Sequence, residues 1–422
     1  MADTGFTTKF ADGRIGFLVS AEYQKRTLTM QTFERNNFFN RRNGTTSTFQ
    51  APQLLQYEQF VVDRTRTGVN GSVQFEATPD LIFTAEGLYS ALNTGRRQDF
   101  LAWRLPNSAT AAIITNPVIV DNAIVAGTAN GTLTTAGQIR NEPTTSMLGA
   151  INGKYDNGTL KIAGDASYSR GTIEQTIQII TLQARSAVPG SFDFRNGTIP
   201  SLTLGTAAAP FNTSDIGNYN PAANGVRSNL LLGRLEEYVG QLDVGYEIGD
   251  AITVDAGIRY ADLRARSNAF RSQVTPTSAE LVPFLNPVIN GTFLNDIGGN
   301  FPRGFLSTAP TFDYVFNRAQ AAQPNPAVPG GLLPNAARDY DLRESTFGGH
   351  LMISVDTKVF GIPTKANAGV RIIATDFGVD TLLQTGTTAA PIFTPVNDAS
   401  KYTNVLPCHS PNIAGAAVSS GS

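Results

Sequence analysis

Few side chains in this sequence are of the types that do covalent or metal chemistry. The 422 residues include two His and one Cys, so a His/Cys metal site or a cysteine nucleophile has almost no residues to draw on. The sequence contains no phosphate-binding loop, no HExxH and no GxSxG motif. His350 lies on the polar side of its segment, where we expect a polar, inward-facing side chain; a ligand contact is the alternative.

Carboxylates occur in close pairs, and paired acids can bind Ca²⁺ or act as general acid and base. The pairs are Glu236 with Glu237, Asp339 with Asp341, and Asp376 with Asp380. All of them fall at the ends of predicted strands, where solvated charge is expected. We therefore predict that the protein is not an enzyme, with no catalytic residues, no cofactor and no metal site.

The strongest pattern is repeated four times, in nine-residue stretches that alternate in polarity. Positions 1, 3, 5, 7 and 9 are apolar or Gly in every copy, position 9 is always Tyr, and the positions between them are mostly polar or small. The copies are residues 15–23 (IGFLVSAEY), 81–89 (LIFTAEGLY), 160–168 (LKIAGDASY) and 252–260 (ITVDAGIRY). A period of two indicates a strand with two unlike faces.

Nine residues is about what a tilted strand needs to cross the hydrocarbon core of a bilayer. An apolar face that ends in an aromatic residue is typical of a transmembrane β-barrel. We therefore predict a lipid-facing aromatic girdle; a sugar-stacking platform is the alternative for the same four residues. The predicted girdle residues are Tyr23, Tyr89, Tyr168 and Tyr260.

Connections of two kinds alternate along the chain. A short turn joins each motif after the first to a predicted strand just before it. These preceding strands are residues 69–77, 147–155, 238–246 and 347–355. The last of them leads into residues 366–374, a fifth copy of the motif without the Tyr. The connections that follow the first four motifs run roughly 30 to 80 residues, as do the extracellular loops of outer-membrane barrels. We expect some loops to carry strands, for example at residues 172–185.

This pattern predicts nine membrane strands. An odd count leaves an open sheet edge, which is unfavourable in lipid because its backbone groups stay unpaired. We therefore expect that the chain alone is not a finished barrel.

Bulk composition fits this architecture. The hydrophobic fraction is 41% and the mean hydropathy is −0.11, and no run of 18 apolar residues predicts a membrane helix. The N-terminal residues do not read as a secretory signal. The net charge is −2 with no evident basic stripe, so we expect no nucleic-acid partner.

Several longer segments resemble the barrel of TonB-dependent receptors of proteobacteria, over about residues 13–407. The resemblance is carried by FDFRNGTIPSL (192–202), GGNFPRGFLS (298–307), FDYVFNR (312–318), VFGIPTKANAGVRIIATD (359–376) and KYTNVLP (401–407). It implies an outer-membrane, 22-stranded barrel around an N-terminal plug. Such receptors take up a scarce ligand, such as a siderophore, cobalamin or an oligosaccharide, and are driven by the TonB complex through the plug.

Compared with this family, we expect the sequence to begin inside the barrel, without the plug, the TonB box and the signal peptide. We expect residues 1–407 to be a partial receptor barrel. Residues 408–422, which contain the only Cys, look unrelated to the family, and we expect them to be an out-of-frame tail. The expected partners are outer-membrane lipid and, in an intact receptor, a small-molecule ligand.

Two other classes of function stay open from the sequence. The first is a general porin or autotransporter-like barrel, which needs an even strand count and a C-terminal membrane strand. The second is a soluble β-rich adhesin or carbohydrate-binding protein. The adhesin predicts a second sheet packed over the apolar face, which would bury Phe83, Ile162 and Val254.

Overall fold

The computed structural model describes residues 2–42, 48–106, 114–195, 201–275, 277, 285–286, 307–308, 333–359, 362–387 and 390–413. The motif segments lie in these ranges. Of the segments that resemble the receptor family, FDYVFNR and nearly all of GGNFPRGFLS lie outside them. Within the described residues, no helix is long and apolar enough to cross a membrane.

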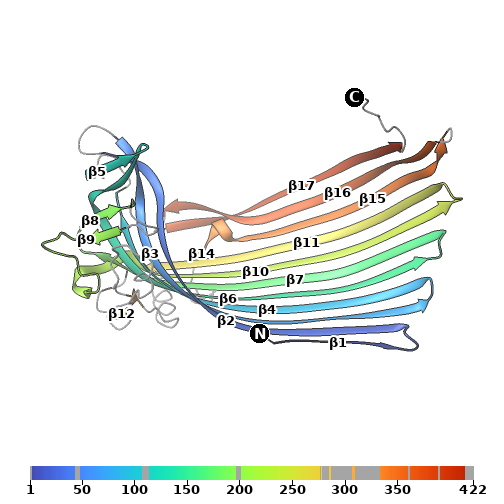
Figure 1. The fold of residues 1–422 in the computed structure, drawn as a ribbon, viewed down its shortest axis with the longest axis horizontal. Coiled ribbons are helices and arrows are strands. Elements are labelled where there is room, and N and C mark those ends of the chain that lie inside the picture. The colour runs from blue at the N-terminus through green and yellow to red at the C-terminus, as the bar shows by residue number, and fades with distance from the viewer. Residues whose placement is uncertain are drawn as a thin grey trace, which may run out of the picture.

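The fold is all-β and is dominated by one open antiparallel sheet (Figure 1). Eleven long strands follow one another in the order β1-β2-β3-β4-β6-β7-β10-β11-β15-β16-β17, and β1 and β17 form the two edges. In chain order they are β1 (Ala2–Phe10), β2 (Ile15–Arg42), β3 (Thr48–Thr78), β4 (Leu81–Arg104), β6 (Ala123–Asp156), β7 (Leu160–Ala184), β10 (Tyr219–Ile248), β11 (Ile252–Val274), β15 (Tyr340–Val359), β16 (Ile362–Thr387) and β17 (Ala390–Ile413).

Short turns join the strands at one end of this sheet. The chain reverses between Thr78 and Leu81 and between Ile248 and Ile252, as the sequence predicts. In the β6–β7 turn, Gly158 has φ +88 and the Asn157 side-chain oxygen accepts the backbone N–H of Leu160 at 2.8 Å. Gly tolerates this conformation because it has no Cβ, and the Asn caps the turn locally.

The first three long connections expected at the other end are largely strand, so that expectation was wrong for them, and most of the fourth lies outside the described residues. Strands β2 and β3 stay paired up to Arg42 and Thr48, and β4 and β6 up to Arg104 and Thr132. The expected strand at residues 172–185 is confirmed as the continuation of β7. The extensions carry apolar side chains as well, among them Leu55, Trp103 and Ile180, but these do not follow the strict alternation that marks the nine-residue segments.

The eleven long strands of the sheet are the nine predicted ones and two more. Strand β1 pairs with β2, and β17 pairs with β16 as far as Ile413. Residues 408–413 continue this pairing, from Cys408 opposite Gly369 to Ile413 opposite Thr364.

A second layer covers one end of the sheet. Three short strands, β5 (Thr115–Val120), β8 (Val188–Asp193) and β9 (Ser201–Leu204), gather at the far ends of β3, β4 and β6, opposite the short turns (Figure 1). We call this layer and the strand ends beneath it the cap. The hydrophobic core of the protein lies here, around Leu55, Trp103 and Ile180.

Candidate functional site

One face of the sheet carries a continuous apolar surface near the short turns. Directly paired residues lie on the same face of an antiparallel sheet, so a line of partners can be followed from strand to strand. From β2 to β16 that line reads Phe17, Val73, Ala85, Ile151, Ala166, Gly240, Tyr260, Phe347 and Ala374. We call this face of the nine-residue segments the apolar belt.

The apolar belt is not covered by a second layer in the described structure. Phe83 is 46% exposed and Ile151 is 63% exposed, and Ile162 and Val254 are half-buried by their neighbours in the sheet. Trp103 has the same parity on β4 as Phe83, yet it is 0% exposed because the cap covers it. The protein therefore buries this face at one end and leaves it bare at the other.

Two shallow grooves mark the bare surface. They form where small residues interrupt the large ones, at Gly153 and Ala166 in one and at Ala256 and Gly349 in the other. Their lining is almost entirely apolar. A groove without polar groups cannot orient a polar ligand, but it can take flexible hydrocarbon chains.

All four predicted girdle tyrosines lie on the belt face. The structure places them in a slanted row: Tyr23 pairs through Thr67 with Ala91, which is two residues beyond Tyr89. The same two-residue offset separates Tyr89 from Tyr168 and Tyr168 from Tyr260.

Each step of the row crosses two inter-strand spacings. Two residues span about 6.6 Å along a strand, and two spacings span about 9.6 Å. The row of tyrosines is therefore inclined by about 35° to the perpendicular of the strands.

Charged residues follow the tyrosines directly on the same face. Two residues beyond the far end of five belt segments stand Lys25, Arg170, Glu236, Asp262 and Asp376, whereas Tyr89 is followed by Ala91 at that position. The Tyr168 hydroxyl donates a hydrogen bond to Glu236 at 2.7 Å, and the Tyr260 hydroxyl donates a longer one to Asp262 at 3.4 Å. These tyrosines thus place their rings in the apolar belt and their hydroxyls in a charged band.

Asp262 is the best-connected residue of this band. It accepts hydrogen bonds from Arg264 at 2.8 Å, from Arg343 at 3.1 Å and from Ser345 at 2.8 Å. Burial works to raise the pKa of Asp262, but these donors outweigh it and hold the pKa below its usual value. The band is therefore a fixed row of charges.

The opposite face is polar along the same segments. The line of partners next to the belt line reads Gln74, Thr84, Asn152, Asp165, Gln241 and Arg259. Asn152 donates a hydrogen bond to Asp165 at 2.9 Å. The face is not uniformly polar, because Leu88 and Leu148 are opposite each other on it.

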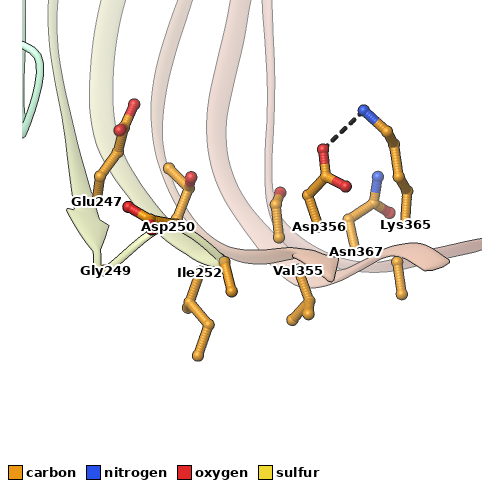
Figure 2. A pocket seen from close by; sticks show the side chains of 12 residues that line it. Glu247, Gly249, Asp250, Ile252, Val355, Asp356, Lys365 and Asn367 are labelled. Carbon is orange, nitrogen blue, oxygen red and sulfur yellow. Dashed lines mark ion pairs between the residues drawn. The ribbon is translucent and has the colours of Figure 1, made fainter. Parts of the chain in front are cut away.

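The difference between the faces is visible at the short turns. A hollow of about 530 Å³ lies there. Around it, Glu247, Asp356 and Lys365 point to one side of the sheet and Ile252 and Val355 to the other (Figure 2). Lys365 and Asp356 form an ion pair at 2.7 Å, but both side chains are mostly exposed, so the pair contributes little to stability.

Farther from the turns, the polar face becomes rich in arginine. Arg26 and Arg64 are direct partners on β2 and β3, and Arg96 and Arg140 are direct partners on β4 and β6. Arg227 and Arg271 are diagonal neighbours on β10 and β11. We call these six residues the arginine patch. Each of the six arginines lies on a different strand. The sequence therefore shows no basic stripe.

Glu58 lies on the same face, beyond the arginine patch, and is 4% exposed. It accepts hydrogen bonds from Gln56 and from Gln98 at 3.0 Å. Burial raises the pKa of Glu58, and Glu34 raises it further, while the two glutamines and Arg96 act in the opposite direction.

The raised pKa of Glu58 predicts how stability depends on pH. The folded state holds this proton more tightly than the unfolded state, so the free energy of unfolding falls as the pH rises from the unfolded pKa to the folded pKa of Glu58, and stays reduced above it. Glu58→Gln should therefore raise the free energy of unfolding at pH 7. The gain should shrink as the pH falls and vanish below the unfolded pKa of Glu, near 4.3. Urea unfolding of both proteins between pH 3 and pH 8 checks this; a gain that does not change with pH contradicts it.

The remaining candidates, His350 and Cys408, lie on different strands of the sheet. His350 lies on the polar face, 4.0 Å from Asp243, and Cys408 is exposed. Among the described residues, no three His, Cys, Asp or Glu side chains come together as metal ligands. Comparison of the chain with protein-family models, with curated proteins and with solved structures gave no match.

Proposed function

We propose that this chain forms the β-barrel wall of a TonB-dependent receptor in the outer membrane of a Gram-negative bacterium. One observation carries the membrane part of the proposal. The apolar belt is bare, and it ends in tyrosines whose hydroxyls meet a charged band. A ring in hydrocarbon with its hydroxyl in the polar region is the arrangement that favours Tyr at a membrane interface.

The geometry of the tyrosine row supports the same proposal. If the four tyrosines mark one level of the bilayer, the strands must tilt by the angle of the row, about 35°. The strands of outer-membrane barrels tilt by about 35 to 45°. The two-residue offset between successive tyrosines also runs in the same direction at every step, as the tilted strands of a barrel wall require.

The adhesin alternative fits the structure less well. It requires a second layer over Phe83, Ile162 and Val254, and the described structure has none there. Among the residues described, a second layer covers this face only at the cap. Exposed apolar surfaces of this extent are unfavourable in water and mark interaction sites or membrane contact.

The receptor part of the proposal depends on the resemblance of residues 192–202, 359–376 and 401–407 to the family. It implies uptake of a scarce ligand, with energy from the TonB complex reaching the wall through a plug domain. A reading frame for a plug beside this one, together with ligand-dependent growth that requires TonB, would support it. Uptake that persists without TonB would favour a general porin.

The belt can be tested with a tryptophan placed on either face of β11. The sequence has one Trp, so Trp103→Phe gives a background without Trp fluorescence. In vesicles of brominated phosphatidylcholine, Ile258→Trp should lose most of its emission, because its belt position contacts the acyl chains. Arg259→Trp, one residue along on the polar face, should lose little. Equal quenching of both would contradict the assignment of faces, and a folded chain that stays in solution without detergent would contradict the membrane proposal.

A further inference from the structure

The arginine patch puts like charges opposite each other. Arg26 is the direct partner of Arg64, and Arg96 is the direct partner of Arg140. Like charges directly across an antiparallel pair destabilise a sheet, whereas opposite charges stabilise it. The protein thus carries two unfavourable pairs on the same face, offset by two residues along the strands, since Arg64 is opposite Thr94 and Arg96 is opposite Val62.

Carboxylates of the protein do not neutralise this charge. In the part of the chain that the structure describes, Arg140 is the one residue of the patch with a carboxylate within 4.0 Å, that of Glu142. Arg96 and Arg271 donate to amide oxygens, those of Gln98 at 2.8 Å and Gln273 at 2.7 Å. Most of the positive charge is therefore available to an external anion.

Two arginines also hold buried donors without an acceptor. The Nε atoms of Arg96 and Arg227 are shielded from solvent and have no hydrogen-bond partner. Leaving such a donor unpaired is unfavourable. Burial lowers the pKa of both groups, and the nearby Arg140 and Arg271, respectively, lower it further. An oxyanion between the arginines would supply the missing acceptors and relieve the repulsion.

The patch has limits that set the size of a ligand. Towards the turns, the same face carries Glu22, Glu86 and Asp165, and on the far side it carries Glu34 and Glu58. A long polyanion would meet these acids. Arg140 and Arg227 stand on β6 and β10, two inter-strand spacings apart, or about 10 Å. A small molecule with several anionic groups fits this window.

We infer that the arginine patch binds a small polyanion that carries carboxylate or phosphate groups. Arg64, Arg96 and Arg140 hold one end of it through charge-assisted hydrogen bonds, and Arg227 and Arg271 hold the other. Under the proposed function, which this inference extends, the polyanion is the cargo or its anionic portion. The binding itself needs only the folded chain.

Titration calorimetry on the full chain, folded in detergent, tests the inference with citrate and with pyrophosphate. We expect wild type to bind at least one of them, and the tighter of the two identifies carboxylate or phosphate as the preferred group. Arg96→Gln and the solvent-exposed Arg64→Gln should each weaken binding by about tenfold or more. Raising the salt from 50 to 500 mM should weaken it as well, because exposed charges are screened.

Arg97→Gln is the matched control. Arg97 is adjacent to Arg96 but lies on the belt face in an ion pair with Asp99, so binding should stay within about twofold of wild type. Without ligand, Arg96→Gln should raise the melting temperature, because it removes a repulsive pair; a merely structural arginine would do the opposite. Failure of the folded wild type to bind either anion overturns the inference, as does an equal loss in Arg97→Gln or a clear preference for single-stranded DNA. Quenching in brominated vesicles is a separate measurement, so loss of the membrane role would leave this result intact.

Discussion

Val254→Arg should destabilise the bilayer-inserted protein by about 2 to 4 kcal/mol, the penalty for a charge on the lipid face of a barrel near the midplane. Val254 lies on the apolar belt between Tyr246 and Ile353, so an arginine there has hydrocarbon around it. Asp255→Arg, the next residue, points to the polar face and should cost less than about 1 kcal/mol, since substitutions there contact water. Urea unfolding of the full chain in phospholipid vesicles measures both values.

The depth of the substituted residue in the bilayer supplies a control, because a soluble sheet would show no dependence on it. Arginine at Val254, Ala256 and Ile258 samples three levels of the belt on one strand. In a bilayer the penalty should be largest near the middle and fall towards the interfaces. If the apolar face instead packs against protein, the penalty will follow side-chain volume and local packing. Equal penalties at Val254 and Asp255 would contradict the assignment of faces.

The alternation of side chains predicted the part of the fold where the two faces have different surroundings. Residues 81–89 and 160–168 are strands with the predicted faces and turns because every second side chain is apolar. The strands β1 and β17 were missed because their side chains lack this regular alternation. On β1, Phe6 and Phe10 share the belt face with Thr4 and Thr8, and on β17, Val405 shares it with Thr403. A strand at the sheet edge can carry such polar residues without a clear period.

The cap was missed because its signal is long-range. Trp103, Leu133 and Ile180 have unremarkable sequence neighbours, and they become a core only when β3, β4, β6 and β7 extend far beyond the tyrosine row. The arginine patch is hidden in the same way. Its members come from six strands, one from each. Only the register of the sheet brings Arg96 opposite Arg140. By contrast, the charged band could have been found, since Lys25, Arg170 and Asp262 each stand two residues after a motif tyrosine.

Trp103→Ala should unfold the cap selectively and cost about 3 to 5 kcal/mol, the usual range for truncating a buried aromatic side chain. Trp103 is 0% exposed, and its Nε1–H donates to the Val188 carbonyl at 3.0 Å. Gly131 and Gly190 make room for its ring: a Cβ at Gly131 would lie 2.6 Å from Nε1. Truncation therefore removes the central contact between the layers and leaves a buried acceptor unpaired.

Limited proteolysis and hydrogen exchange across residues 185–218 check the expectation, because this connection holds β8 and β9 against the sheet. Trp103→Phe keeps most of the ring and loses mainly the hydrogen bond, so it should cost only about 1 kcal/mol. In Trp103→Ala, exchange of the amides in residues 252–260 should stay as slow as in wild type in vesicles, because under the proposed function lipid and strand pairing stabilise the belt independently of the cap. Parallel loss of protection in both regions would show that the cap and the belt unfold as one unit, and would contradict the division of this face into a protein-covered end and a lipid-covered end.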